Sequence, residues 1–460
     1  MPLELENRRV LVLGLGSSGM SMARWLATRG ARVRVADSRT AAPNAERLHA
    51  ELPQVELHTG AFRPETFADA ELIAISPGIP LAEPLVQASL ARGLEVVGDI
   101  ELFARARNEF PGAKVLGITG SNGKSTVTEM AGAMVRAAKT RTLVAGNIGL
   151  PILDALSEIR AGQRRRPDVF VLELSSFQLE TTASLDVDAG AVLNLSEDHL
   201  DRYAGMREYA QAKARIFFGN GTQVVNRQDA WARSMAGAGR RVFTFGLDEP
   251  QQEGAWGLRD LAGELWLAEG GANLMKVSEL KVSGLHNAAN ALAALALCRA
   301  IGIAYEPLLD ALFNFRGLPH RVQRIAEIRG VVFFDDSKGT NVGATVAALE
   351  GMGTKVVLIA GGDGKGQDFS PLRDVVAQHA RAVVLIGRDR DRIAAAIESS
   401  GVLLIRATDM HEAVRASLAL AHAGDAVLLS PACASFDMFR NYEHRAQVFV
   451  DEVMALERAQ

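Results

Sequence analysis

Short apolar runs alternate with amphipathic stretches along nearly the whole chain. This alternation predicts α/β architecture with mainly parallel sheets, because buried strands need helices to cover their faces. The expected strands form three groups: Arg9–Leu13, Arg32–Ala36 and Leu72–Ser76; Val115–Thr119, Thr142–Ala145, Val169–Leu174 and Ala189–Asn194; and Val331–Phe334, Lys355–Ile359, Ala382–Ile386 and Ala426–Leu429. Each group begins its own strand–helix series, which indicates three doubly wound units.

Two interruptions separate these groups. One is Pro111-Gly112, which breaks a helical segment, and the other is Arg316-Gly317-Leu318-Pro319, which follows a helix-rich stretch. We therefore expect domains at residues 1–108, 109–318 and 319–460, as the length of 460 residues also suggests at about 150 residues per domain. The segment from Leu247 to Gly271 alternates weakly and is rich in Gly, so it predicts hairpins or a loop.

The most informative turn is Gly120-Ser121-Asn122-Gly123-Lys124-Ser125-Thr126. It follows a predicted strand and precedes a predicted helix from Val127 to Ala138. Backbone N–H groups in such a turn point at phosphate oxygens, the lysine reaches the outer phosphates, and the serine hydroxyl binds Mg²⁺. The strict pattern has Gly where this chain has Ile118, so a purely structural turn is the alternative. The favoured interpretation is a site that binds and cleaves a nucleoside triphosphate.

A second glycine-rich turn, Gly14-Leu15-Gly16-Ser17-Ser18-Gly19, follows the first predicted strand and precedes a helix that Gly30 is placed to end. This fingerprint predicts a nearby diphosphate, with Asp37 meeting a ribose. Alternatively, the glycines only allow close packing of helix on strand. A nicotinamide dehydrogenase is the obvious function, but hydride transfer needs no triphosphate. A nucleotide-linked substrate fits both turns.

Three residues of the middle region are candidates for metal chemistry. Glu173 closes a buried strand, where ligands of α/β sheets gather, so it is placed for Mg²⁺; the alternative is an edge carboxylate facing water. His199 is either a metal ligand or a structural polar contact. Lys213 shares one helix face with Tyr209 and Ile216, so its ammonium must reach water, pair with an acid or be modified.

Three loops of the last third follow predicted strands. They run from Asp335 to Asn341, from Gly361 to Gly366 and from Ser430 to Phe436. Each alone is consistent with a solvated turn. Together they place Gly, Ser and two lysines, Lys338 and Lys365, at one end of a sheet, which predicts a pocket for an anionic small molecule.

Composition and charge narrow the class of protein. The chain is 48% hydrophobic and 23% charged, and its net charge of −4 supplies no electrostatic reason for nucleic acid or an anionic membrane as partner. Cys298 and Cys433 fit two buried thiols in a reducing compartment. The N-terminus has no signal-peptide pattern, and no apolar run approaches about 18 residues. We expect a cytoplasmic monomer without a membrane-inserted segment.

Taken in order, the motifs resemble those of the Mur ligases of peptidoglycan synthesis, over essentially the whole chain. The resemblance rests on Gly120–Thr126, Glu173–Glu180, Asn194–Tyr203, His286-Asn287 with Asn290, His320-Arg321, Asp336–Asn341, Gly361–Lys365 and Ser430–Tyr442. The phosphate loop of that family also lacks the glycine at the Ile118 position. The resemblance implies a Rossmann-like N-terminal domain for a UDP substrate, a central P-loop ATPase-like domain, and a Rossmann-like C-terminal domain for glutamate and nucleotide.

Within the family, the match is nearest to the member that adds glutamate. The resemblance implies that ATP phosphorylates the carboxylate of UDP-N-acetylmuramoyl-L-alanine and that the amine of D-glutamate attacks the acyl phosphate. It implies ATP, Mg²⁺ at two sites and a CO₂-derived carbamate on Lys213. A pocket of lysines and hydroxyls binds the carboxylates of either hand, so the stereochemistry of glutamate stays open.

The resemblance also implies roles for individual residues. The catalytic residues are Lys124, Glu173, His199 and Lys213, and the metal ligands are Ser125, Glu173, His199 and Lys213. The ATP-binding residues are Gly120, Ser121, Asn122, Gly123, Lys124, Ser125, Thr126, Asn287, Asn290, Arg321 and Asp336. The UDP-substrate residues are Ser17, Ser18, Ser38, Arg39, Gly78, Asn147 and Gln178. The glutamate-binding residues are Lys338, Thr340, Lys365, Ser435, Phe436 and Tyr442, of which the two aromatic residues replace the commonest residues and leave fine specificity open.

Other functions remain alternatives. A related Mur ligase, or a ligase that uses L-glutamate, would share most of these motifs. A folyl-polyglutamate ligase also adds glutamate but usually lacks the turn Gly14–Gly19. A nicotinamide-dependent oxidoreductase would use that turn and would not need ATP, whereas a non-catalytic nucleotide switch would not require both substrates for phosphate release.

Overall fold

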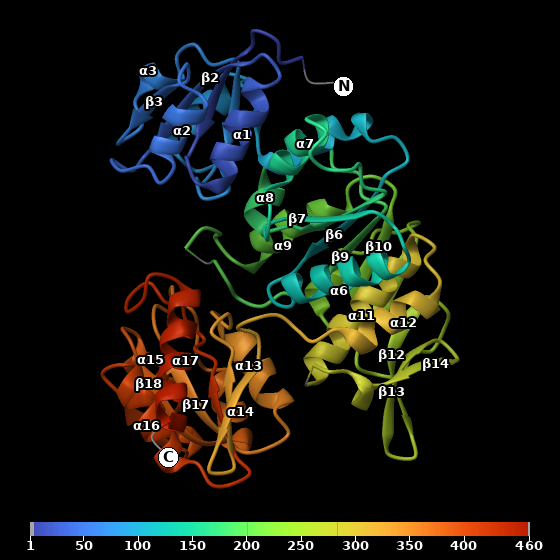
Figure 1. The fold of residues 1–460 in the computed structure, drawn as a ribbon, viewed down its shortest axis with the longest axis vertical. Helices are drawn as coiled ribbons and strands as arrows, with labels where there is room; N and C mark the ends of the chain where they lie inside the picture. Colours follow the sequence, from blue (N-terminus) through green and yellow to red (C-terminus); the bar gives the residue numbers. More distant parts are fainter. Residues whose placement is uncertain (1–3, 200, 283, 459–460) are drawn as a thin grey trace.

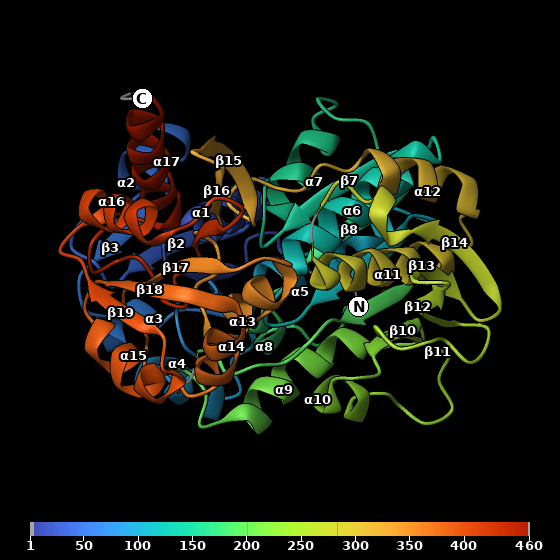
Figure 2. The same cartoon turned by 90° about the horizontal axis from the view of Figure 1, so that it is seen from below.

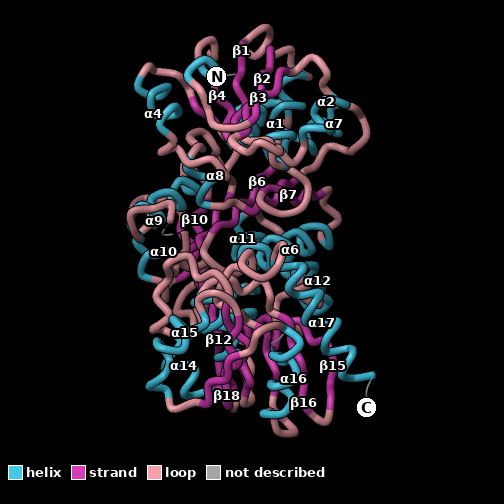
Figure 3. The backbone as a smooth tube through the Cα atoms, turned by 90° about the vertical axis from the view of Figure 1, so that its left-hand side faces the viewer, coloured by secondary structure: helices cyan, strands magenta, loops and turns pink. Residues whose placement is uncertain are grey.

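The computed structural model describes residues 4–199, 201–282 and 284–458. Three α/β units follow one another along the chain, each built around its own sheet (Figure 1). Figure 3 shows the N-terminal unit at one end of an elongated molecule and the C-terminal unit at the other. The predicted domain limits at residues 108 and 318 stay predictions. Residues 1 and 460 of those domains, and Leu200 of the Asn194–Tyr203 motif, lie outside the described residues.

The N-terminal unit has a parallel sheet in the order β3-β2-β1-β4-β5. Its elements are β1 (Arg9–Leu13), α1 (Ser17–Ala27), β2 (Arg32–Asp37), α2 (Ala45–Glu51), β3 (Glu56–Thr59), α3 (Pro64–Phe67), β4 (Leu72–Ile75), α4 (Pro84–Ala91), β5 (Val96–Val97), α5 (Asp99–Ala106) and η1 (Arg107–Glu109). Val10 and Val12 pack under α1 and α2, whereas Leu11 and Leu13 pack under α3 and α4. Successive side chains of a strand point to opposite faces, so one apolar run fills both layers.

The central unit has nine strands in the order β14-β13-β12-β11-β10-β9-β6-β8-β7. Its elements are β6 (Lys114–Thr119), α6 (Lys124–Ala137), β7 (Thr142–Gly146), α7 (Ile152–Arg160), β8 (Val169–Glu173), α8 (Ser176–Glu180), β9 (Ala189–Val192), α9 (Met206–Ala214), η2 (Arg215–Phe217), β10 (Thr222–Asn226), α10 (Ala230–Ser234), β11 (Val242–Phe245), β12 (Ala255–Leu261), β13 (Glu264–Glu269), β14 (Ala272–Lys276), η3 (Val277–Glu279), α11 (Leu285–Ala300) and α12 (Tyr305–Asn314). Strand β6 lies between β8 and β9, all parallel, so the turn after it sits where the chain departs to both sides of the sheet.

The weakly alternating segment from Leu247 to Gly271 contributes an antiparallel hairpin. Strands β12 and β13 pair from Trp256 with Glu269 to Leu261 with Glu264. The two turn residues, Ala262 and Gly263, have φ of 55° and 84°. Positive φ at both positions matches the right-handed twist of the strands, so a two-residue turn closes the hairpin.

The C-terminal unit has six strands in the order β15-β16-β20-β17-β18-β19, parallel except for β15 on β16. Its elements are β15 (Gln323–Ile328), β16 (Val331–Asp335), α13 (Val342–Gly351), β17 (Val356–Gly361), α14 (Leu372–His379), β18 (Ala380–Ile386), α15 (Arg390–Ile397), η4 (Glu398–Ser400), β19 (Leu403–Arg406), α16 (Met410–Leu420), β20 (Ala426–Leu429) and α17 (Tyr442–Arg458). Val356 and Leu358 pack under α13 and α14, and Val357 and Ile359 under α16 and α17, so helices cover both faces (Figure 2).

Contacts join the three units. The ring of Phe103 in α5 meets Phe170 of β8 edge-on at 5.1 Å, which anchors α5 on the central sheet. The side-chain amides of Asn122 and Asn341 exchange hydrogen bonds of 3.2 and 2.9 Å between the central and C-terminal units. Within residues 4–199, 201–282 and 284–458, none of the helices has the length and apolarity needed to span a bilayer.

Candidate functional site

The turn Gly120–Thr126 is a strand–loop–helix junction, as predicted. Strand β6 ends at Thr119, and α6 begins at Lys124, three residues earlier than the predicted helix. Gly120 and Gly123 have φ of 154° and 81°, backbone conformations that residues other than glycine adopt only with strain. The first N–H groups of α6 therefore face the loop, where they are available to an anion.

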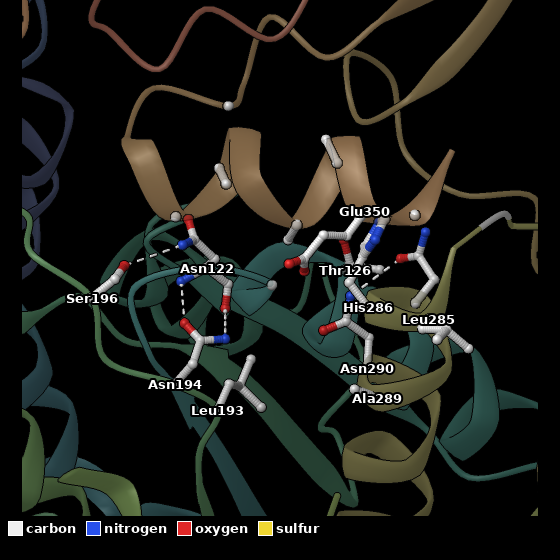
Figure 4. Close-up of a pocket in the computed structure, with 18 of the residues that line it drawn as sticks. Asn122, Thr126, Leu193, Asn194, Ser196, Leu285, His286, Ala289, Asn290 and Glu350 are labelled. Atoms are coloured by element: carbon white, nitrogen blue, oxygen red, sulfur yellow. Dashed lines mark hydrogen bonds between the residues drawn. The ribbon is translucent and has the colours of Figure 1, made fainter. Parts of the chain in front are cut away.

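Asn194, just after β9, fastens this loop (Figure 4). Its side-chain oxygen accepts from the N–H of Asn122 at 2.8 Å, and its amide donates to the Asn122 carbonyl at 3.1 Å. Its own carbonyl accepts from the N–H of Ser121 at 2.8 Å. Strand β9 consequently stops at Val192, before the predicted end at Asn194, because the chain there pairs with the loop.

Lys124 and Glu173 lie at the carboxyl ends of neighbouring strands. The Lys124 ammonium donates to the carbonyls of Gly120 and Ser121, both at 2.8 Å. Burial lowers the pKa of Lys124, and the negative charges of Glu173 and Asp198 oppose that shift. One oxygen of Glu173 accepts from the Asn147 amide at 2.8 Å, whereas its buried Oε2 has no hydrogen-bond partner among the described residues. A carboxylate oxygen left free at this place fits a ligand of Mg²⁺.

The other proposed metal ligands are less closely assembled. The Ser125 hydroxyl accepts from Arg321 at 2.9 Å, and the His199 ring packs on Phe177 with centroids 4.6 Å apart. Burial lowers the pKa of His199, against the charge of Asp198. In the part of the chain that the structure describes, no three His, Cys, Asp or Glu side chains are grouped to hold a metal. The proposed set contains only two residues of these types, so it depends on Ser125 and on a changed Lys213.

Lys213 on α9 is buried, with 1% of the residue exposed. Its amine donates to the Gly120 carbonyl at 2.9 Å and lies 4.5 Å from the centre of the Tyr209 ring. Burial, reinforced by the charge of Lys124, lowers the pKa of Lys213 well below its ordinary value. The alternative in which its ammonium reaches water is therefore wrong, and a neutral amine is favoured.

A cavity of about 590 Å³ lies between the N-terminal and central units. Its lining contains all the residues that the family resemblance assigned to the UDP substrate: Ser17, Ser18, Ser38, Arg39, Gly78, Asn147 and Gln178. The first glycine turn forms one wall, and Gly19 approaches the Gly14 carbonyl so closely that an added Cβ would lie 1.8 Å from it. The turn therefore serves both close packing and the wall of a cavity.

Asp37 also lines this cavity, and the expectation that it meets a ribose stays a prediction. Its carboxylate accepts from the N–H of Leu15 at 2.7 Å and pairs with the Arg39 guanidinium at 2.6 Å. The Arg39 side chain holds the pKa of Asp37 at about 2. Because these partners occupy both oxygens, Asp37 braces the glycine turn, which weakens the case for a nicotinamide cofactor.

A second cavity, of about 490 Å³, lies between the central and C-terminal units beside α11 and α13 (Figure 4). Of the predicted ATP-binding residues, those that line it are Asn122, Gly123, Thr126, Asn287, Asn290, Arg321 and Asp336. Gly120, Ser121, Lys124 and Ser125 belong to the adjoining loop and do not line it. The two units thus form this cavity jointly.

The three C-terminal loops meet, as predicted. Ser430 donates to Asp336 at 2.7 Å, and Asp363 pairs with Ala434 in an antiparallel bridge. The Lys338 ammonium lies 3.6 Å from the centre of the Tyr442 ring, and burial lowers the pKa of Lys338 to about 8. The other residues predicted to bind glutamate lie in or near these loops. The N–H of Thr340 donates to the Lys338 carbonyl, and the charge of Lys365 acts on His199. Ser435 is buried, whereas Phe436 is 72% exposed.

The sequence matches models of three domains along its length. They are the "Mur ligase MurD-like, N-terminal domain" at residues 8–98, the "Mur ligase middle domain" at 118–298 and the "Mur ligase, glutamate ligase domain" at 320–433. The chain belongs to the Mur ligase family. Members of this family are ATP-dependent ligases that use Mg²⁺.

Curated proteins resemble this Mur ligase over their full lengths. Two of them are named UDP-N-acetylmuramoylalanine–D-glutamate ligase. The protein from Methylobacillus flagellatus is 58% identical over 99% of both chains, and that from Thiobacillus denitrificans is 59% identical over 100% of this chain and 99% of its own. Among solved structures, UDP-N-acetylmuramate-alanine ligase MurC from Thermotoga maritima has a TM-score of 0.60 at 17% identity and covers 97% of this chain and 99% of its own. MurF from Acinetobacter baumannii has a TM-score of 0.61 at 18% identity and covers 96% of this chain and 93% of its own. These structures share the fold.

No role was predicted for Asp198 from the sequence of this Mur ligase. Its charge acts on Lys124 of α6, on Tyr209 and Lys213 of α9, and on His199 in the loop between β9 and α9. Asp198 is thus the common counter-charge of the site. Its place beside His199 in an acidic stretch was a signal, but that stretch also contains Glu197 and Asp201, and periodicity does not say which carboxylate faces inward.

Replacing Gly123 with alanine is expected to weaken ATP binding at least about tenfold. A Cβ there would lie 2.5 Å from the side-chain oxygen of Asn290, and the φ of 81° adds strain of about 1 kcal/mol. The control is Gly112→Ala, where φ is 80° and no atom lies within 4 Å of the Cβ. Titration with an ATP analogue measures the affinity of both variants. It separates the clash with Asn290, present only in Gly123→Ala, from the strain of positive φ, present in both. Equal affinities of Gly123→Ala and the parent protein would contradict this role.

Asp336 should make stability fall as pH rises. Burial raises its pKa from 3.8 to about 7, despite the Ser430 hydrogen bond and the Arg321 charge. Between these values the folded state holds more protons than the unfolded state, so unfolding becomes easier with increasing pH. Asp336→Asn should gain roughly 2–4 kcal/mol relative to the parent between pH 4 and pH 8 in urea unfolding. Parallel stability curves for the two proteins would refute the shift.

Proposed function

We propose that this Mur ligase joins D-glutamate to UDP-N-acetylmuramoyl-L-alanine with cleavage of ATP, as the names of its curated relatives suggest. The observation that carries the proposal is the hydrogen bond of 2.8 Å from the Asn147 amide to Glu173. It links a residue of the cavity that contains the first glycine turn to Glu173, which ends the strand next to β6, the strand that precedes the phosphate loop. A UDP-linked carboxylate and a triphosphate can therefore meet at one place. We further propose a cytoplasmic location, where both nucleotides are made.

In the first step, an oxygen of the substrate carboxylate attacks the γ-phosphorus of ATP, the bond to the β-phosphate oxygen breaks, and ADP leaves. The residues have mainly to position the reactants and stabilise charge. Lys124 would bind the outer phosphates, and the N–H groups after Gly123 would face the anion; the position of Lys124 at the start of α6 supports this role. Asn287, Asn290, Arg321 and Asp336 would hold the nucleotide between the two units.

Ser125 and Glu173 would hold one Mg²⁺, and His199 with a modified Lys213 a second. The buried, unpaired Oε2 of Glu173 supports this assignment. When bound, the metal supplies charge that offsets the repulsion between carboxylate and triphosphate. Asp198 would offset the positive charge of Lys124.

In the second step, the amine of glutamate attacks the acyl carbon, and phosphate leaves after a tetrahedral intermediate. Lys338 and Lys365 would pair with the two carboxylates, since both lie in loops at one end of the C-terminal sheet. With a pKa near 8, Lys338 still carries its charge at neutral pH. Thr340, Ser435 and Tyr442 would add hydrogen bonds, and Phe436 would cover glutamate only after it binds, because it is exposed without it.

We also infer that Lys213 carries a carbamate. Its neutral amine can attack the carbon of CO₂ and release a proton, which leaves an anionic carbamate. Burial and the nearby Lys124 charge favour the neutral amine before the reaction, and the Lys124 charge favours the anion after it. The change would turn a buried neutral amine into an anion that could hold a metal.

The function is tested by offering D-glutamate, L-glutamate and meso-diaminopimelate in parallel with ATP and UDP-N-acetylmuramoyl-L-alanine. Phosphate release should need the UDP substrate together with D-glutamate and should yield one amide per ATP. Preference for another amino acid would assign the chain to a different branch of the family. Phosphate release without either substrate would exclude the ligase reaction.

A further inference from the structure

Arg202 lies at a junction of three segments beside the proposed active site. Its side chain is 11% exposed. The guanidinium donates to both carboxylate oxygens of Glu180, from Nε at 3.1 Å and from NH2 at 2.6 Å. This two-point pairing orients the planar group in a way that a single contact does not. Glu180 is the last residue of α8, the helix that also carries Gln178.

The same guanidinium reaches across to the N-terminal unit. It donates to the carbonyl of Pro77 at 2.7 Å and to that of Ile79 at 3.3 Å. These residues flank Gly78, and all three line the cavity assigned to the UDP substrate. The loop after β4 is therefore attached to the central unit through its backbone carbonyls. The position of this loop depends on Arg202 and little on the loop's own side chains.

Arg202 is also connected to His199. Its backbone N–H donates to the His199 carbonyl at 2.9 Å. The guanidinium lies 4.1 Å from the centre of the Phe177 ring, whose own centre is 4.6 Å from that of His199. One side chain thus touches the UDP cavity wall, α8 and the aromatic support of His199.

We propose that Arg202 is a positioning residue for the UDP-linked substrate. It holds the loop Pro77–Ile79 in register with α8, so that a molecule bound in the N-terminal cavity presents its carboxylate to the phosphate loop. It acts through that loop and does not touch the reacting atoms. The inference rests on the proposed function. Lysine cannot replace it, because one ammonium cannot pair with two oxygens of Glu180 and reach two carbonyls as well.

The test compares Arg202→Lys with Arg215→Lys. Arg215 is exposed and donates to the carbonyls of Glu180 and Thr182, so it contacts the same end of α8 and provides a matched control. In Arg202→Lys, the KM for UDP-N-acetylmuramoyl-L-alanine should rise at least about tenfold, with the KM values for ATP and D-glutamate within about twofold of the parent. The control should keep all three KM values.

Direct binding of the UDP substrate, measured by calorimetry without ATP, provides a second readout. Weakened binding in Arg202→Lys, with unchanged binding of an ATP analogue, supports the proposal. An unchanged KM and unchanged binding of the UDP substrate overturn it, as does an equal loss of affinity for all three substrates. If the parent protein fails to bind the UDP substrate, the proposed function fails first, and the two failures are distinguishable.

Discussion

Replacing Lys124 with methionine is expected to lower kcat for amide formation about 1,000-fold or more. The lysine is the positive charge of the loop Gly120–Thr126, and loss of such a charge from a site of phosphoryl transfer has effects of this size. Its ammonium is partly buried and donates only to carbonyls of its own loop among the described contacts. Methionine has similar length and removes the charge.

The same geometry predicts that the variant remains folded. Burial lowers the pKa of Lys124, which means that the charged form destabilises the folded state, so an uncharged side chain should not lower the thermal midpoint. Lys139→Met is the control and should keep its activity, because Lys139 is exposed and lies two residues beyond the end of α6. Single-turnover formation of ADP measures the first step. A kcat within about tenfold of the parent would show that Lys124 does not bind the transferred phosphate.

Replacing Lys213 with alanine is expected to lower kcat at least about 100-fold, with the nucleotide still bound. The reason follows from the proposed carbamate, because alanine cannot be carbamylated and the anion that would complete the second metal site would be lost. Bicarbonate or a short carboxylic acid should restore part of the activity, since the space left by the side chain lies next to the loop carbonyl of Gly120. Initial rates with and without the additive are the measurement.

Gln211→Ala is the matched control, because Gln211 is exposed on the same helix. It should be fully active and insensitive to the acid. The parent protein should also lose activity when CO₂ is removed from the buffer and regain it when bicarbonate is added. Full activity of Lys213→Ala without any additive would refute the carbamate.

Sequence patterns predicted most of the strands inside each sheet. Runs such as Val115–Ile118 and Val356–Ile359 are almost continuously apolar because both faces of a parallel strand are covered. Some missed strands lie at the sheet edges, such as β3 (burial along Glu56–Thr59 is only partial) and β19, where partial exposure permits polar residues. The buried strand β10, in the middle of the central sheet, was also missed, because polar residues interrupt its short apolar run.

The candidate site was predictable only where chemistry and turn geometry occur together in a short stretch. Gly120–Ser125 combines glycines with positive φ, a lysine and a helix start, so its place followed from local rules. Asp37 shows the limit of such rules. It follows a strand at the expected distance, yet Arg39 and Leu15 occupy its oxygens, and only the tertiary structure reveals that competition.

The amino-acid sequence by itself determined the family, the three α/β units and the identity of the phosphate loop, because these depend on local periodicity and on motifs within single loops. The tertiary structure decided what lies next to what. It brought Asn147 to Glu173, buried Lys213 against Gly120, and let Arg202 hold a loop more than a hundred residues away in the sequence. Those contacts join residues far apart in the sequence, and the last of them joins two units. Their free energy depends on desolvation and on the pairing of buried polar groups, which no local pattern records.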